Sequence, residues 1–188
     1  MALDRYTRSP QSTTQEESSP FFPRFVYGTW QALKGLICVG EAPEADYIQR
    51  AVQWLKSVQN ADGGWGETCD SYKDVTLKAK GKSTASQTAW AVMGLVTAGE
   101  IDSPEVDRGM EFLLSTQKED GTWDEPEYTG TGFPDVFYLR YGLYRVTFPL
   151  FALGYYRNVR DGTVFRGVGD KVITAPRDRS RARSLEVR

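Results

Sequence analysis

The residues of this sequence best suited to unusual chemistry are aromatic. Phe133, Phe137, Tyr141 and Tyr144 follow one another at steps of four, four and three residues. The face of a desolvated aromatic ring stabilises a cation by about 2 kcal/mol or more, so rings that gather in a cavity hold positive charge without capturing it. The same spacing is also typical of the apolar stripe of a core helix. From spacing alone, the core interpretation is favoured.

Other kinds of chemistry are excluded by residues that the sequence lacks. It contains no histidine and only two cysteines, Cys38 and Cys69. A Ser-His-Asp or Cys-His arrangement is therefore impossible, as is a zinc site that uses histidine. Two cysteines are too few for a disulfide framework or an all-cysteine zinc site. We expect two reduced thiols and no metal.

A motif that occurs twice indicates how the chain is organised. Residues 59–65, Gln-Asn-Ala-Asp-Gly-Gly-Trp, recur 58 residues later as 117–123, Gln-Lys-Glu-Asp-Gly-Thr-Trp. The candidate structural positions in the two copies are Gln59, Gly63, Trp65, Gln117, Gly121 and Trp123. We expect each Asp-Gly turn to place its tryptophan over the end of the preceding helix, while the glutamine amide binds open backbone groups. The motif is thus predicted to be a staple between helices rather than a ligand contact.

Apolar spacing predicts the helices that this motif connects. Residues 47–58 follow i, i+3, i+4 steps, and a second such helix starts at Pro104 behind the N-cap residue Ser103. Residues 90–96 are more apolar, so this third helix is expected to lie deeper. Residues 136–157 are mainly apolar and aromatic, and they predict a fourth helical region that Pro149 kinks or interrupts. No segment alternates as a strand does. The repeating unit is helix, glycine turn, helix and motif loop.

Composition predicts one helical domain with polar ends. Of the 188 residues, 40% are hydrophobic, and we assign the domain to residues 21–160. Residues 1–20 are polar and residues 161–188 are rich in arginine, so both segments are predicted to be disordered. With a net charge of −2, the arginines favour a solvated tail over nucleic acid binding. No apolar run is long enough to span a membrane, and we expect a cytoplasmic protein, soluble or attached to one membrane face as a peripheral or monotopic protein.

These motifs carry a resemblance to a known family. The pattern aromatic-Leu-x-x-x-Gln-x-x-x-Gly-x-Trp resembles the QW repeat of triterpene cyclases, and residues 59–67 are close to its form in squalene-hopene cyclases. Residues 83–91, Ser-Thr-Ala-Ser-Gln-Thr-Ala-Trp-Ala, and 129–134, Thr-Gly-Thr-Gly-Phe-Pro, are similar to the same family, as are the aromatic residues in 137–149. The similarity covers about residues 25 to 157.

The resemblance implies an all-α fold, an α/α toroid built from helical hairpins, here as an incomplete barrel. It implies the C-terminal part of an isomerase that cyclises squalene through carbocations, without metal or cofactor. On the matching positions, Phe137 resembles a ring that stabilises a late cation, and Phe133 one that faces the middle-to-late centres. Tyr141 and Tyr144 match tyrosines that shape this wall, and Tyr27 matches a further cavity-side tyrosine. This match favours the cavity over the core interpretation.

The acid that starts such a reaction is absent from the sequence. The family protonates squalene with the middle aspartate of an Asp-x-Asp-Asp motif, and no such motif occurs here. We therefore expect no turnover by this chain alone. A partner is implied, the N-terminal half of a cyclase that carries Asp-x-Asp-Asp.

Three interpretations remain open from sequence. The first is the C-terminal part of a cyclase, as a fragment, a truncated product or half of a split enzyme. The second is a non-catalytic helical module that binds isoprenoid lipid, or an inactive remnant. The third, a protein prenyltransferase β-subunit, shares the toroid, but its zinc site needs a histidine that this chain lacks.

Overall fold

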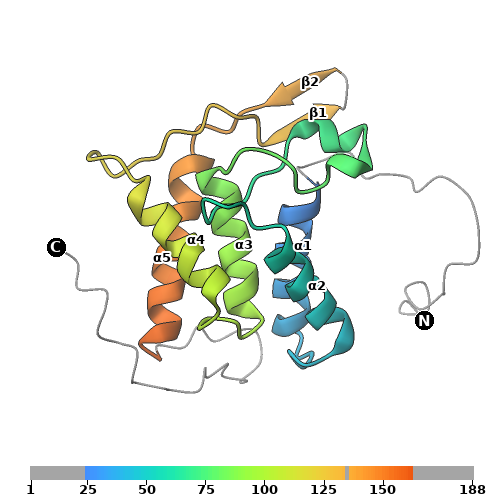
Figure 1. The fold of residues 1–188 in the computed structure, drawn as a ribbon, viewed down its shortest axis with the longest axis vertical. Helices are drawn as coiled ribbons and strands as arrows, with labels where there is room; N and C mark the ends of the chain where they lie inside the picture. Colours follow the sequence, from blue (N-terminus) through green and yellow to red (C-terminus); the bar gives the residue numbers. More distant parts are fainter. Residues whose placement is uncertain (1–23, 134–135, 163–188) are drawn as a thin grey trace, which may run out of the picture.

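The computed structural model describes residues 24–133 and 136–162, and Figure 1 shows how they are arranged. The helices are α1 Arg24–Cys38, α2 Asp46–Ser57, α3 Ala85–Thr97, α4 Pro104–Ser115 and α5 Tyr144–Arg160. Two short 3-10 turns, η1 Cys69–Tyr72 and η2 Val75–Leu77, follow α2, and two short strands, β1 Gly130–Phe133 and β2 Phe137–Leu139, precede α5. The expectation of an all-α fold is confirmed apart from this small sheet.

Helix α3 lies at the centre and contacts the other four helices. All of its residues are buried, whereas α2 buries only Ile48, Val52 and Leu55. In Figure 1, α1 and α5 lie on either side of α3, and α2 and α4 lie in front of this row. The helices therefore alternate between an inner row, α1, α3 and α5, and an outer pair, α2 and α4. The prediction that residues 90–96 lie deep in the fold is confirmed.

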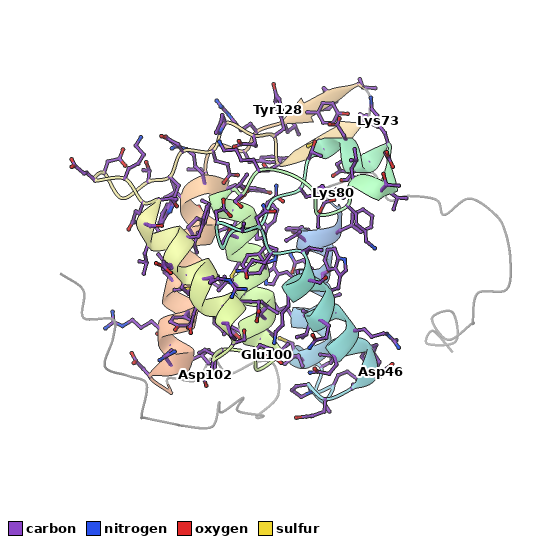
Figure 2. All side chains as sticks on the ribbon, in the orientation of Figure 1. Asp46, Lys73, Lys80, Glu100, Asp102 and Tyr128 are labelled. Atoms are coloured by element: carbon purple, nitrogen blue, oxygen red, sulfur yellow. The ribbon has the colours of Figure 1, made fainter. Side chains whose placement is uncertain are left out.

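Each hairpin turns at a glycine, as the repeat predicts. Gly40 joins α1 to α2 and Gly99 joins α3 to α4, with φ values of 95° and 89°. This left-handed conformation is readily adopted only by glycine. Figure 2 shows the turn end of the molecule at Asp46 and Glu100, and the opposite, loop end at Lys73 and Tyr128. The inner helices all begin at the loop end.

The predicted start of the second outer helix is also confirmed. Pro104 is the first residue of α4, and the Ser103 hydroxyl accepts a hydrogen bond from the backbone N–H of Val106. A side-chain oxygen at this position satisfies one of the backbone donors that a helix start leaves open.

The expectation that no strand occurs is wrong. Strands β1 and β2 pair antiparallel, with Gly130 opposite Leu139 and Phe133 opposite Phe137. The hairpin is too short for period-2 alternation to stand out, and its register shifts between Thr131 and Phe133. Glycines within β1 further weaken the pattern on which strand prediction depends.

The helix predicted over residues 136–157 begins only at Tyr144. Its first third is instead β2 and a turn, because the Gly142 region breaks the apolar run before α5. Helix α5 continues through Pro149, which lies in its second turn, so the proline does not interrupt it. The helical core stripe that the aromatic spacing suggested does not exist, since Phe133, Phe137 and Tyr141 all precede the helix.

Three further observations concern the termini, the membrane and the cysteines. The polar segment 1–20 and all of 161–188 except its first two residues lie outside the described residues. Within the part of the chain that is described, no helix combines the length and apolarity needed to cross a bilayer. Cys38 and Cys69 are both free thiols.

Candidate functional site

Aromatic rings from the three inner helices converge at the loop end of the molecule. Trp90 of α3 lies edge-on to Tyr27 of α1 and to Phe148 of α5, with ring centroids 4.9 Å and 5.3 Å away. Trp90 also stacks parallel to Trp30 at 6.5 Å and meets Tyr144 at 6.1 Å. We call these five rings, Tyr27, Trp30, Trp90, Tyr144 and Phe148, the aromatic cluster. Each of the four rings that Trp90 contacts is more than 50 positions away from it in the sequence.

Tyr141 extends the cluster to the surface. Its ring stacks on Tyr144 with centroids 4.6 Å apart and planes 21° from parallel. Tyr141 is 39% exposed, while Tyr144 is half-buried. Burial raises the pKa of the Tyr144 phenol, and the neighbouring Tyr141 and Tyr27 raise it further. The Tyr144 phenol is therefore neutral at physiological pH, and the Tyr141 ring stacked on it is exposed.

The hairpin carries the other two predicted cavity residues. Phe133 and Phe137 lie on the paired strands with ring centroids 6.0 Å apart, edge to face. They are 59% and 42% exposed, which is unusual for phenylalanine. The structure thus places Tyr27, Tyr141 and Tyr144 in one set of ring contacts and the two phenylalanines in another. Their exposure makes these rings accessible to an apolar molecule.

A pocket of about 540 Å³ with charged residues in its lining opens beside Tyr141. Its lining residues are Asp124, Glu125, Pro126, Arg140, Tyr141, Gly142 and Arg145. Arg145 donates a hydrogen bond to the Trp123 carbonyl oxygen. With two arginines and two carboxylates in its lining, this pocket is unsuited to a hydrocarbon.

The metal-ligating side chains and the Cys69 thiol are the other groups with possible chemistry. In the described residues, no three His, Cys, Asp or Glu side chains are grouped so that they would hold a metal ion. Burial raises the pKa of the Cys69 thiol to about 11, and Asp70 and Glu67 add to the effect. That thiol is protonated at neutral pH and is a poor nucleophile. The aromatic rings are the groups that distinguish this site.

The repeated motif forms the same contacts in both copies. Trp65 Nε1 donates to the Leu55 carbonyl at 2.8 Å, and Trp123 Nε1 donates to the Leu113 carbonyl at 2.8 Å. Both acceptors lie in the last turn of an outer helix, where carbonyl groups lack partners within the helix. The glutamine amides also correspond, since Gln59 donates to the Gly63 carbonyl and Gln117 to the Gly121 carbonyl. Each motif fastens its loop to the end of its own outer helix.

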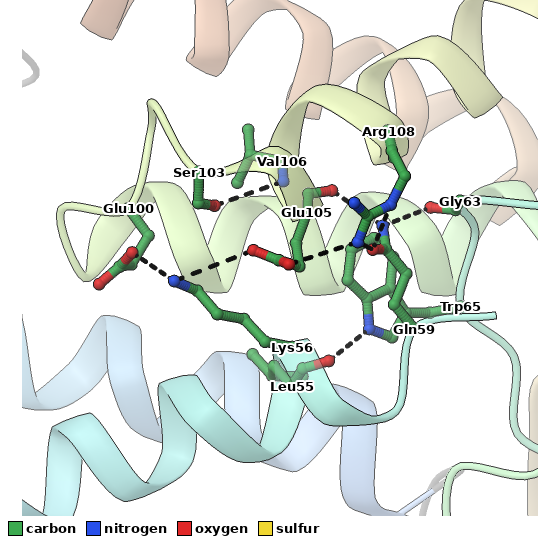
Figure 3. A network of polar contacts seen from close by, with 10 residues as sticks. All are labelled: Leu55, Lys56, Gln59, Gly63, Trp65, Glu100, Ser103, Glu105, Val106 and Arg108. Carbon is green, nitrogen blue, oxygen red and sulfur yellow. Dashed lines mark hydrogen bonds and ion pairs between the residues drawn. The ribbon is translucent and has the colours of Figure 1, made fainter. Parts of the chain in front are cut away.

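The first copy also connects the two outer helices (Figure 3). Gln59 Nε2 donates a second hydrogen bond to the Glu105 carbonyl at 2.8 Å, and Gln59 Oε1 accepts from Arg108. Nearby, Lys56 Nζ lies 2.6 Å from Glu100 Oε2 and 4.0 Å from Glu105 Oε2. These partly buried ion pairs and hydrogen bonds fix α2 against α4.

Two glutamates that were not predicted as site residues complete the motif. Glu67 and Glu125 are both nearly fully buried, at 3% and 6% exposure. Glu67 Oε2 accepts from the backbone N–H groups of Phe25 and Val26 at the start of α1. Glu125 accepts from the backbone N–H and the hydroxyl of Ser86 at the start of α3. They are 58 residues apart, so the repeat offset itself is the signal that could have found them.

Helical hairpins, each stapled by a Gln-to-Trp loop and arranged around an aromatic cluster, define an α/α toroid protein of the triterpene cyclase class. Comparison with known families specifies the class further. Residues 10–158 match the family described as squalene-hopene cyclase C-terminal domain. The chain belongs to this family.

Curated relatives agree with the family match. The chain is 53% identical over 141 residues to squalene–hopene cyclase of Bradyrhizobium diazoefficiens, covering 73% of this chain and 21% of the relative. It is 49% identical over 151 residues to the Zymomonas mobilis enzyme of the same name, covering 78% and 23%. The corresponding Alicyclobacillus acidocaldarius protein is 50% identical over 133 residues, covering 71% and 21%. The chain thus spans about a fifth of the length of these relatives.

Proposed function

We propose that this chain supplies the C-terminal wall of the substrate cavity in a squalene-cyclising triterpene cyclase. Phe133, Phe137, Tyr141 and Tyr144 face the carbocations that arise during polycyclisation, and Tyr27 completes the wall from α1. The observation that carries the proposal is the combination of exposed rings on the hairpin with a packed aromatic cluster behind Tyr141. The relatives named squalene–hopene cyclase support squalene as the substrate.

The rings suit this reaction because they stabilise a carbocation without neutralising it. A carboxylate beside a carbocation would capture or deprotonate it, whereas a desolvated ring face contributes about 2 kcal/mol or more and leaves it intact. At about 1.4 kcal/mol for each tenfold change in rate, a few such rings account for several orders of magnitude. Exposure of Phe133 and Phe137 at the loop end leaves their faces accessible to a hydrocarbon.

The initiating acid must come from elsewhere. Protonation of an alkene needs a strong carboxylic acid, and this sequence has no Asp-x-Asp-Asp. Glu125 is a buried carboxyl that lines the same pocket as Tyr141, but it accepts two hydrogen bonds from Ser86, and burial raises its pKa. A raised pKa makes it a weaker acid. The proposed partner is the N-terminal half of a cyclase that carries the acid.

A second candidate function is non-catalytic binding of an isoprenoid lipid, or no remaining function. The missing acid motif favours it, because cation stabilisation has no effect where no cation forms. In this alternative the same exposed rings pack against a lipid without converting it. Affinity without turnover would distinguish the two functions.

The deciding experiment is a squalene turnover assay with product analysis by mass spectrometry. The chain is assayed alone and mixed with a separately expressed N-terminal half that carries Asp-x-Asp-Asp. We expect cyclised product only in the mixture. Product from the chain alone would contradict the missing acid, and a folded, associated mixture that makes no product would favour lipid binding or an inactive remnant.

Peripheral attachment to one membrane face is part of the same proposal. Leu150 and Phe151 of α5 are 51% and 48% exposed and give the surface an apolar patch. We expect the chain to float with lipid vesicles, and Leu150→Ser with Phe151→Ser to abolish flotation. Unchanged flotation of this double variant would place the attachment elsewhere.

A further inference from the structure

Trp90 contacts all four of the other rings in the aromatic cluster. It contacts Tyr27 and Trp30 from α1 and Tyr144 and Phe148 from α5, at centroid distances between 4.9 Å and 6.5 Å. Its own exposure is 0%, so it cannot touch a substrate. Tyr27 and Tyr144, by contrast, are only half-buried. Trp90 lies directly behind two residues of the proposed wall.

The hydrogen bonding of Trp90 differs from that of the other fully buried tryptophans. Trp65 and Trp123 each donate the indole N–H to a helix-end carbonyl. The Nε1 of Trp90 is buried without a hydrogen-bond partner among the described residues. Burying an unpaired donor is unfavourable, so the contacts of the ring must compensate for it. Trp90 therefore contributes to the fold through the contacts of its ring and not through a hydrogen bond.

The ring contacts have a defined geometry. Trp90 meets Tyr27, Tyr144 and Phe148 at interplanar angles of 78°, 80° and 77°. Edge-to-face contacts of this kind are favourable and directional, because the positive ring edge meets a negative ring face. They restrain both the position and the tilt of each partner. An aliphatic side chain would fill the space without fixing the tilt.

We propose that Trp90 is a positioning residue for the cyclisation, which holds Tyr27 and Tyr144 at the orientation that the cavity wall requires. The inference rests on the proposed function and adds a residue from α3 that no carbocation touches. Its consequence is that loss of the Trp90 ring lets both tyrosines reorient while the helices remain packed. Cations are then stabilised less well at late stages, and intermediates are released early.

The test compares Trp90→Leu and Trp90→Phe with Trp123→Phe in the complex of this chain and the acid-bearing half. Trp123→Phe is the matched control, since it also truncates a fully buried tryptophan but lies outside the aromatic cluster. We expect Trp90→Leu to raise the share of incompletely cyclised products by about threefold or more. Trp90→Phe retains a ring and should restore much of the wild-type distribution. Trp123→Phe should lower stability and leave the distribution unchanged.

A second measurement does not depend on turnover. Nitration of Tyr144 by tetranitromethane, located by mass spectrometry, reports how freely its ring is reached in the full chain. We expect Trp90→Leu to accelerate it about threefold relative to wild type, with exposed Tyr47 of α2 as the internal reference. Trp123→Phe should leave the ratio unchanged.

The outcomes separate the two proposals. If wild type in the complex makes no product, the proposed function fails, and nitration alone decides the role of Trp90. If wild type is active but both Trp90 variants keep wild-type products and nitration, Trp90 only packs the core and the inference is overturned. If Trp90→Leu does not fold, Trp90→Phe decides the role of the ring, with a smaller change expected in the same direction.

Discussion

Glu67 and Glu125 occupy the same place in the two repeats, and each closes the start of the inner helix of its own hairpin. Glu67 binds the N-terminus of α1 and Glu125 that of α3. The tryptophan two residues earlier binds the end of the outer helix of the same hairpin. One loop therefore satisfies open donors of one helix and open acceptors of the other. A carboxylate at a helix N-terminus is also favoured by the helix dipole.

Glu125 makes stability depend on pH. Burial raises the pKa of its carboxyl, and the opposing hydrogen bonds from Ser86 do not cancel this. Between the unfolded pKa, about 4.3, and the higher folded value, the native state binds more protons than the unfolded state. The free energy of unfolding attributable to Glu125 therefore falls as pH rises through this window.

We test this by urea unfolding of wild type and Glu125→Gln from pH 4 to 8. The stability of wild type relative to the variant should decrease as pH rises, because only wild type has this group to ionise. The exposed Glu119→Gln is the matched control and should parallel wild type. A constant difference between wild type and Glu125→Gln would contradict the assignment.

Much of this architecture could be predicted from the sequence because it rests on local, repeated signals. The 58-residue offset predicted the motif loops, the same repeat with one residue of slip predicted the glycine turns, and Ser103 with Pro104 marked a helix start. The offset did not reveal the partners of each motif, since Glu67 and Phe25 are 42 residues apart and meet only in the folded chain. A contact between residues far apart in the chain produces no periodic pattern in the sequence.

The hairpin before α5 was missed for a different physical reason. Phe133, Phe137 and Tyr141 have helical spacing, but the glycines around them disfavour a helix and permit turns. The aromatic residues themselves were identified by resemblance, whereas the apolar run predicted only that Trp90 lies deep in the fold. Its ring partners come from helices on both sides, so no spacing within α3 could have indicated them.

Gly109 tests how tightly the first motif packs against the second hairpin. A Cβ at this position would lie 2.7 Å from Val92 Cγ2 and 2.8 Å from Trp65 Cζ3. Overpacking of this kind costs about 1–3 kcal/mol, which exceeds the roughly 1 kcal/mol that alanine gains over glycine in a helix. We expect Gly109→Ala to lower the free energy of unfolding.

Gly154 of α5 is the matched control for this change. Nothing lies within 4 Å of a Cβ built there, so Gly154→Ala should raise stability by up to about 1 kcal/mol. Chemical denaturation of both variants measures the difference. Equal effects of the same sign would show that Trp65 does not constrain α4.

Gln59 and Gln117 should differ in importance although they are equivalent in sequence. Gln59 bonds Gly63, Glu105 and Arg108, whereas the described contacts of Gln117 include the Gly121 bond alone. At about 1 kcal/mol for each net hydrogen bond, Gln59→Ala should cost about 1–2 kcal/mol more than Gln117→Ala. Urea unfolding of the two variants provides the comparison, and equal losses would mean that the link to α4 contributes nothing.

Phe137 separates the cavity interpretation from the core interpretation. A fully buried phenylalanine costs about 3–5 kcal/mol when replaced by alanine. Phe137 is 42% exposed on a short strand, so Phe137→Ala should cost much less in the free energy of unfolding. In the complex with the acid-bearing half, loss of its ring should shift products towards incompletely cyclised material, because a late cation is less well stabilised. Tyr128→Ala is the control, since Tyr128 is 56% exposed and packs on Tyr138 outside the proposed wall. If Phe137→Ala unfolds the chain and the product distribution of folded complexes stays that of wild type, Phe137 is a packing residue and the wall must be assigned to other rings.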